Sequence, residues 1–204
     1  FTLQYEMSYT NILNMLDMSG ITIRASERGE DEPIIMAGGP CAYNPEPLYD
    51  IVDFFEIGEG EEMMNDVLEV YARHKANGKV NKKEFLREIS KIGGIYVPSL
   101  YDVTYNEDGT IKEFKPKYED VPAKVKKRIV NDFDSVSFPD EMIVPYTEIV
   151  HDRVVLETAR GCTNGCRFCQ AGMIYRPVRE KTTNTLLELS LIHISEPTRR
   201  VVIS

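Results

Sequence analysis

Residues 157–170 read Glu-Thr-Ala-Arg-Gly-Cys-Thr-Asn-Gly-Cys-Arg-Phe-Cys-Gln and hold three of the four cysteines of the chain. These three are spaced C-x3-C-x2-C, at positions Cys162, Cys166 and Cys169. Gly161 and Gly165 lower the steric cost of the tight turns that such a short loop needs. Three soft thiolates on one loop suit an iron–sulfur cube and leave one iron open, where a substrate can bind.

A structural zinc site of the Cys3His type is the main alternative, with His151 as the fourth ligand. Such sites usually take their ligands from two separated pairs, whereas an apolar run lies between His151 and the cysteines. A disulfide framework is disfavoured further, because the cysteines form one cluster and a singleton, Cys41. This usage is typical of a reducing compartment, and we expect a cytoplasmic protein.

The cysteine run resembles the signature of the radical S-adenosylmethionine (SAM) superfamily, in which an aromatic residue precedes the last cysteine. Phe168 is that residue here. The longer run 160–179 is similar to a largely uncharacterised subfamily of radical SAM proteins that carry a cobalamin-binding domain. The resemblance implies that Phe168 packs beside the adenine of SAM. It also implies a [4Fe–4S] cluster on Cys162, Cys166 and Cys169, whose open iron holds SAM for reductive cleavage, and a reductant such as flavodoxin or ferredoxin.

Two glycine motifs follow expected strands, Gly38-Gly39-Pro40 and Gly58-Glu59-Gly60. Alone, they read as turn formers, and the acidic residues of the second motif disfavour a phosphate at the following helix start. Together with their neighbours they resemble the cobalamin-binding domain that precedes many radical SAM barrels. The resemblance implies a cobalamin site that includes Thr2, Gly38, Gly39, Pro40, Gly58, Glu59 and Gly60.

Strand, loop and helix signals alternate over the first 75 or so residues, which predicts a parallel sheet covered by helices. We expect helices over residues 9–18, 47–52 and 61–74, and short strands over residues 21–23, 33–37 and 54–57. The spacing of apolar residues in the helix over 61–74 predicts one buried face, made of Met64, Val67, Leu68 and Tyr71.

The middle of the chain predicts a helix over residues 81–92 that buries Phe85, Leu86 and Ile89. Asn106–Gly109 is a strong hairpin signal between strands over 101–105 and 110–114. Extended segments are expected over 144–149 and 153–158, the second as the first barrel strand, which would deliver the cysteine loop at its carboxyl end. Thr182 or Thr183 would cap the helix that follows.

The predicted fold class is α/β, with a partial Rossmann-like cobalamin-binding domain followed by the first βα unit of a truncated radical SAM barrel. We expect four segments: the cobalamin-binding-like domain over 1–75, truncated at its start; a helix, hairpin and linker region over 76–145; the start of the radical SAM domain over 146–188; and a tail over 189–204. Residues 189–199 resemble a translated sequencing-library adapter. We therefore expect an artefactual tail on an inactive fragment.

The net charge of −9 argues against a general electrostatic grip on nucleic-acid phosphates. Lys124–Arg128 is one local basic run, more typical of a solvated surface than of a nucleic-acid contact. No stretch approaches the roughly 18 apolar residues that would span a membrane, so no membrane partner is expected.

The parent protein is therefore expected to be a cobalamin-dependent radical SAM enzyme of unknown substrate, for methyl transfer or another radical modification. One alternative keeps the cluster without cobalamin, as in methylthiotransferase-like enzymes that act on RNA or protein. A cluster cysteine within residues 1–75 would favour it, and that range holds only Cys41. The other alternative is a non-enzymatic, zinc-stabilised α/β module.

Overall fold

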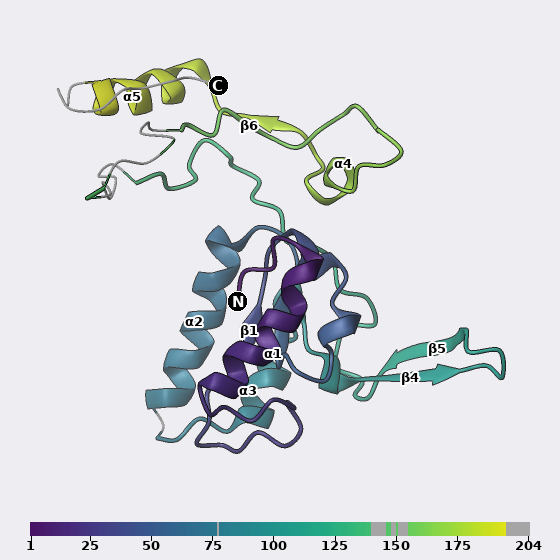
Figure 1. Ribbon diagram of the computed structural model, residues 1–204. Helices are drawn as coiled ribbons and strands as arrows, with labels where there is room; N and C mark the ends of the chain where they lie inside the picture. The colour runs from purple at the N-terminus through teal and green to yellow at the C-terminus, as the bar shows by residue number, and fades with distance from the viewer. Residues whose placement is uncertain (77, 140–145, 148–149, 151–154, 195–204) are drawn as a thin grey trace. The chain divides into compact units, whose positions relative to one another are not determined.

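The computed structural model describes residues 1–76, 78–139, 146–147, 150 and 155–194. The chain forms two compact units, Phe1–Ile129 and Val130–Ser204 (Figure 1). Helices and a three-stranded sheet make up the first unit, together with a projecting hairpin. The second unit holds the cysteine run.

The sheet of the first unit consists of β1 (Met36–Ala37), β2 (Phe54–Glu56) and β3 (Ile95–Tyr96), in that order. β1 and β2 are parallel, whereas β2 and β3 are antiparallel. An isolated parallel bridge between Thr2 and Gly38 continues the sheet beyond β1. The carboxyl ends of β1 and β2 therefore lie at the same edge and lead into the two glycine motifs.

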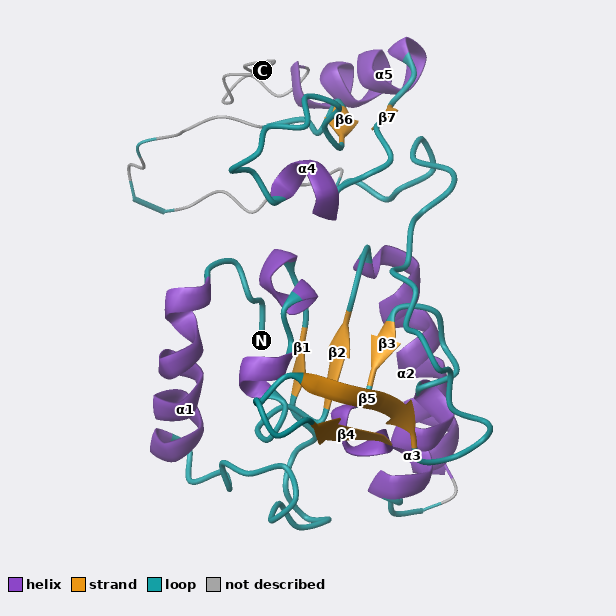
Figure 2. Cartoon of the chain, turned by 90° about the vertical axis from the view of Figure 1, so that its right-hand side faces the viewer, coloured by secondary structure: helices purple, strands orange, loops and turns teal. Residues whose placement is uncertain are grey.

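Helix α1 (Tyr9–Met18) lies on one side of these strands, and α2 (Gly60–Ala76) and α3 (Lys82–Ile89) lie on the other (Figure 2). The bounds of α1 confirm the prediction for residues 9–18. Asn81 caps the start of α3, and its side-chain oxygen accepts hydrogen bonds from two backbone N–H groups of the first turn. The first unit also has short 3-10 helices at Glu6–Ser8, Pro40–Tyr43, Glu46–Leu48 and Pro98–Leu100.

One hydrophobic core holds the first unit together. Phe54 meets the ring of Phe85 edge-on at 6.3 Å between ring centroids, which ties β2 to α3. Phe55 is fully buried and stacks on its cross-strand partner Tyr96 at 6.1 Å. As predicted, α3 buries Phe85, Leu86 and Ile89.

The strand predicted over residues 21–23 is absent, because a buried arginine occupies its backbone groups. Arg28 donates to the carbonyls of Thr22 and Ile23 at 3.0 and 2.9 Å, and Glu32 accepts from the N–H of Thr22 at 2.7 Å. Arg28 also pairs with Asp53 at 2.5 Å, and neither side chain is more than 2% exposed. Side chains thus replace the ladder that a strand would have formed.

The sheet is mixed rather than parallel, which corrects the expectation. A parallel pair needs one crossover helix to return the chain to its starting end. Two helices, α2 and α3, connect β2 to β3, so the chain reverses once more and β3 runs antiparallel. The strand expected over 33–37 is shortened to β1, and the helix expected over 47–52 is a 3-10 turn at Glu46–Leu48.

The buried face of α2 also differs from the prediction. Met63, Val67 and Val70 face the core, whereas Leu68 is 54% exposed and Tyr71 36% exposed. Only Val67 belongs to both sets. Two neighbouring apolar stripes run along this helix, and periodicity alone could not decide which one meets the sheet.

The predicted hairpin is confirmed as β4 (Tyr101–Tyr105) and β5 (Ile111–Pro116), which project from the unit in Figure 1. Its turn is closed by the N–H of Asn106, which donates to the carbonyl of Thr110 at 2.8 Å. At its base, Tyr101 stacks on Phe114 with 4.9 Å between ring centroids.

The second unit contains β6 (Ala159–Arg160), α4 (Ala171–Ile174), β7 (Arg179–Glu180) and α5 (Thr183–Ile194). The barrel strand expected over 153–158 is not formed in its described part, 155–158; the strand begins at Ala159 instead. β6 pairs antiparallel with β7, because the chain returns directly after the cysteine loop. The cap prediction holds for Thr182, whose hydroxyl accepts from the N–H of Thr185 at 3.4 Å.

Candidate functional site

The cysteine loop leaves β6 and returns toward α4 within the second unit. Cys162 and Cys169 are partly exposed and Cys166 is exposed, and all three are free thiols. The N–H of Cys169 donates to the carbonyl of Cys166 at 3.1 Å, which closes the turn between the last two cysteines. The loop thus offers three accessible sulfurs on a backbone that already turns back on itself.

Gly161 fixes the entry of this loop. Its φ is +108°, and an added Cβ would lie 2.8 Å from the carbonyl oxygens of Tyr175 and Pro177. Real side chains do not tolerate such contacts with backbone atoms, so only glycine fits at this position. The chain before Cys162 is therefore held against the segment that returns from the loop.

A strap of residues 130–134 secures the base of the loop from the other side. Arg179 donates to the carbonyl of Val130 at 2.8 Å, and buried Lys181 donates to that of Phe133 at 2.6 Å. Asp134 accepts from the N–H of Thr182 at 2.7 Å, and this bond holds the pKa of the carboxyl below its usual range. The strap is thereby joined by polar contacts to β7 and to the two residues that follow it.

The donor set of the loop fits an iron–sulfur cluster. Such clusters are bound by thiolates, and the three cysteines supply every protein ligand that a cube with one open iron requires. The sulfurs do not converge in advance: among the described residues, no group of three or more Cys, His, Asp or Glu side chains gathers around a common point. Cluster binding would therefore draw the three side chains inward. His151, the fourth ligand of the zinc alternative, lies outside the described residues.

Phe168 projects from the loop between two of the cysteines and is 93% exposed. The ring is therefore not packed as a core residue beneath the loop. The ring is instead available to a planar group that approaches the loop. Such exposure of a large apolar side chain is costly unless a partner covers it.

The glycine motifs of the first unit fit closely against the chain's own backbone. Gly39 has a φ of +101°, and a Cβ there would lie 2.9 Å from the carbonyl oxygen of Leu3. A Cβ on Gly58 would overlap the backbone of Arg128, which pairs with Gly58 in an isolated bridge. Both glycines are explained by contacts within the chain. The residues present therefore do not fit a cobalamin tail at Gly39 or Gly58.

Two other residues of that predicted site, Gly38 and Gly60, lie near Glu56, which sequence reasoning missed. Gly38 lies near this side chain and is bridged to Thr2; Gly60 begins α2, Pro40 begins a 3-10 turn, and the N–H of Glu59 donates to Arg128. Glu56 is 6% exposed, and its Oε1 has no hydrogen-bond partner in the part of the chain that the structure describes. Burial raises the pKa of Glu56. Only its place at the end of an apolar strand could have singled it out.

Cys41 differs from the other three cysteines in its environment. It is 7% exposed within the core of the first unit, and burial raises the pKa of its thiol. Thiolates, not thiols, bind metals. Cys41 is therefore a poor cluster ligand, which counts against the methylthiotransferase-like alternative.

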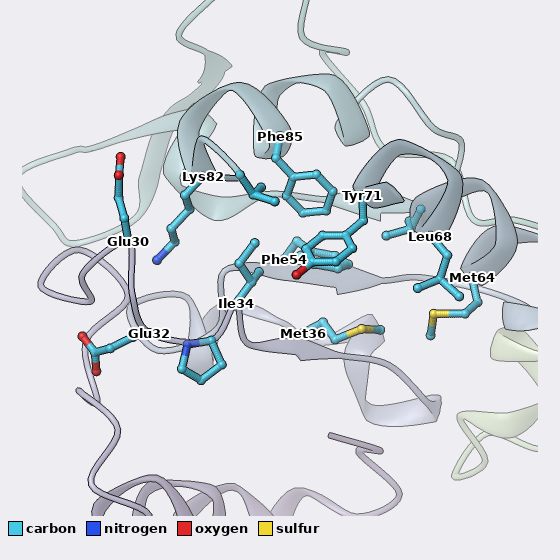
Figure 3. Close-up of a pocket in the computed structure, with 13 residues that line it drawn as sticks. Glu30, Glu32, Ile34, Met36, Phe54, Met64, Leu68, Tyr71, Lys82 and Phe85 are labelled. Atoms are coloured by element: carbon cyan, nitrogen blue, oxygen red, sulfur yellow. The ribbon is translucent and has the colours of Figure 1, made fainter. Parts of the chain in front are cut away.

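A pocket of about 350 Å³ lies between the sheet, α2 and α3 (Figure 3). Tyr71, Leu68 and Met64, the exposed stripe of α2, form one wall and face Phe54 and Phe85. Charged groups lie at one end, where Lys82 pairs with Asp53 at 2.8 Å. The pocket suits an apolar group, and its described lining holds no cysteine.

The basic run Lys124–Arg128 is partly neutralised within the first unit. Arg128 lies 2.9 Å from the carboxylate of Glu62 and 3.2 Å from that of Asp66. Within the described ranges, no helix is both long enough and apolar enough to cross a bilayer.

Comparison with known proteins supports the family indicated by the cysteine run. Residues 1–98 match the family model described as radical SAM proteins, N-terminal. The chain is also similar to an uncharacterized protein of Methanocaldococcus jannaschii, with 28% identity over 190 residues, which cover 93% of this chain and 33% of that protein. The chain thus spans about a third of the length of this relative. No solved structure matches.

Proposed function

We propose that this chain carries the cluster-binding loop and the amino-terminal part of a radical SAM enzyme. The observation that carries the proposal is the C-x3-C-x2-C loop, which lies in the same chain as a segment matching the radical SAM amino-terminal family. The two features are independent, because the match covers residues 1–98 and the cysteines lie beyond it. Both point to the same superfamily.

In this proposal Cys162, Cys166 and Cys169 hold a [4Fe–4S] cluster. Such a cluster supplies one electron for the reductive cleavage of SAM bound at its open iron. The chain itself positions the cysteine loop. Gly161 anchors the entry of the loop, and the strap holds the strands that flank the loop. Phe168 offers an exposed ring against which the adenine can stack. A low-potential electron donor such as flavodoxin or ferredoxin completes the requirements.

Cobalamin dependence, methyl transfer and a cytoplasmic location remain proposals that rest on sequence features alone. Gly39 and Gly58 serve the packing of the chain itself, so neither glycine leaves room for a cobalamin tail. If cobalamin binds the first unit, the edge near Gly38, Gly60 and Glu56 is where the described residues leave a polar group to be satisfied. Titration of the chain with hydroxocobalamin, followed by absorption, tests this directly.

The experiment for the main proposal is anaerobic reconstitution of the chain with iron and sulfide, followed by electron paramagnetic resonance (EPR) of the dithionite-reduced sample with and without SAM. We expect a cluster signal whose shape changes when SAM is added, because SAM coordinates the open iron. Metal analysis of the same sample separates the zinc alternative. A colourless protein that retains zinc and takes up no iron would overturn the proposal.

A further inference from the structure

Three cations surround one buried aromatic ring at the base of the cysteine loop. The ring of Phe133 belongs to a residue that is 4% exposed. Lys181 Nζ, Arg160 Cζ and Arg179 Cζ lie over it, at 4.6, 5.0 and 5.8 Å from its centroid. A cation within about 6 Å of a ring face is attracted to the ring. Phe133 thus gathers positive charge where β6 and β7 carry the loop.

Two of these cations face each other directly across the strands. Arg160 and Arg179 are register partners in the β6–β7 pair. Like charges directly opposite each other destabilise an antiparallel pair. The chain nevertheless fixes both: Arg160 makes two bonds to Glu157, at 2.9 and 2.8 Å, and Arg179 bonds to the carbonyl of Val130. Glu157 offsets the charge of Arg160, but its side chain is 42% exposed against 14% for Arg160, so water screens the carboxylate more than the guanidinium. A poorly screened cation is thus held beside the loop.

Arg160 has a fixed place beside the loop. It lies two residues before Cys162, at most about 7 Å along the backbone. Gly161, between them, lies so close to the returning backbone that an added Cβ would be 2.8 Å from the carbonyl oxygens of Tyr175 and Pro177. The side chain of Arg160 is 14% exposed, whereas Arg167, within the loop, is exposed. A cation with little solvent access keeps more of its electrostatic effect, because water and salt screen it less.

We propose that Phe133 and Glu157 hold Arg160 as a fixed cation that raises the reduction potential of the cluster on the three cysteines. The inference rests on the proposed function, since it requires that cluster. A cube with three thiolate ligands is anionic and gains a further negative charge on reduction. A fixed cation favours the reduced form. In this step one electron passes from a low-potential donor to the cluster, and no bond forms or breaks.

The test is a potentiometric titration of the reconstituted full chain with dithionite, followed by EPR. Arg160→Gln should lower the equilibrium constant for one-electron reduction at least threefold, as a shift to more negative potential, with unchanged iron content. Arg160→Lys keeps the charge and should stay closer to wild type. Phe133→Leu keeps all three cations but removes the ring that positions them, and should shift the potential in the same direction by less.

Two results would overturn the inference while leaving the proposed function intact. One is a wild-type potential in Arg160→Gln with a normal iron content. The other is an equal shift in Arg160→Gln and Arg160→Lys, which would show that shape rather than charge matters. If Arg160→Gln does not fold, Phe133→Leu decides, since a wild-type potential in that variant would also overturn it. Failure of the wild-type chain to take up iron would overturn the proposed function, and this inference with it.

Discussion

The two units of the chain are stabilised by different means. The large hydrophobic cluster, from Leu3 to Val121, lies entirely within Phe1–Ile129. In the described part of the second unit, the buried hydrophobic residues are Val130, Phe133, Leu156 and Ile174. That unit depends instead on side chains that bond to backbone carbonyls and on cations over one ring.

This difference indicates that the two units have different roles. The first unit buries enough apolar surface to form a stable scaffold. In its described residues the second unit buries few apolar side chains around the loop, so a bound group should add much of its stability. Metal binding that selects a folded arrangement contributes its free energy to folding. We therefore expect the second unit to become more resistant to unfolding once the cluster is bound.

The largest effect should come from the core of the first unit. Phe55→Ala removes a fully buried ring that stacks on Tyr96, and should lower the free energy of unfolding by about 3–5 kcal/mol. Urea denaturation followed by circular dichroism measures it. Leu68→Ala, at a side chain that is 54% exposed, is the control and should change stability by about 0.5 kcal/mol or less. Similar losses of unfolding free energy in the two variants would mean that the core of the first unit is not centred on residues such as Phe55.

A second prediction concerns the loop entry. Gly161→Asn introduces a side chain that meets the backbone of residues 175–178, and should abolish cluster uptake while urea denaturation of the first unit stays unchanged. Gly165→Asn is the matched control, because its φ of +63° is accessible to asparagine and the nearest atom to an added Cβ is 4.0 Å away. Iron content after reconstitution checks both. Equal iron in the two variants would contradict the account.

The smallest predicted effect depends on pH and on Glu56. Burial raises the pKa of its carboxyl above the ordinary value of 4.5, so the folded state binds more protons than the unfolded state above that pH. The contribution of this group to stability is therefore present at low pH and is lost as pH rises through the raised pKa. Glu56→Gln should raise the melting temperature at pH 7 relative to wild type, and by less at pH 4. A difference that does not change with pH would show that the pKa of this carboxyl is the same in the folded and unfolded states.

Local patterns in the sequence predicted α1, α3 and the β4–β5 hairpin, because caps, periodicity and turn residues act over short distances. Which of the two apolar stripes of α2 is buried depends on where the sheet lies, and the spacing of apolar residues carries no information about that. The strand expected over 21–23 was lost to Arg28, a partner whose role depends on the folded position of Asp53. Long-range polar contacts leave no pattern in a single sequence.

The candidate site divides in the same way. Spacing was enough to single out the three cysteines and Phe168, because their chemistry lies in one loop. The cation cluster around Phe133 joins residues 133, 160, 179 and 181, and only the fold brings these together. For the glycine motifs, the sequence indicated turn formers or a cobalamin site, whereas the close packing of Gly39 and Gly58 against the chain's own backbone depends on the fold.

The most direct test of the central claim compares one cysteine of the first unit with the three of the second. Wild type and four single Cys→Ala variants are reconstituted anaerobically, and bound iron, sulfide and the charge-transfer absorption are measured. We predict that Cys162→Ala, Cys166→Ala and Cys169→Ala each lose the chromophore, whereas Cys41→Ala, which alters a buried core thiol, retains it. Loss of the chromophore in Cys41→Ala alone, with full iron in the other three, would contradict the account.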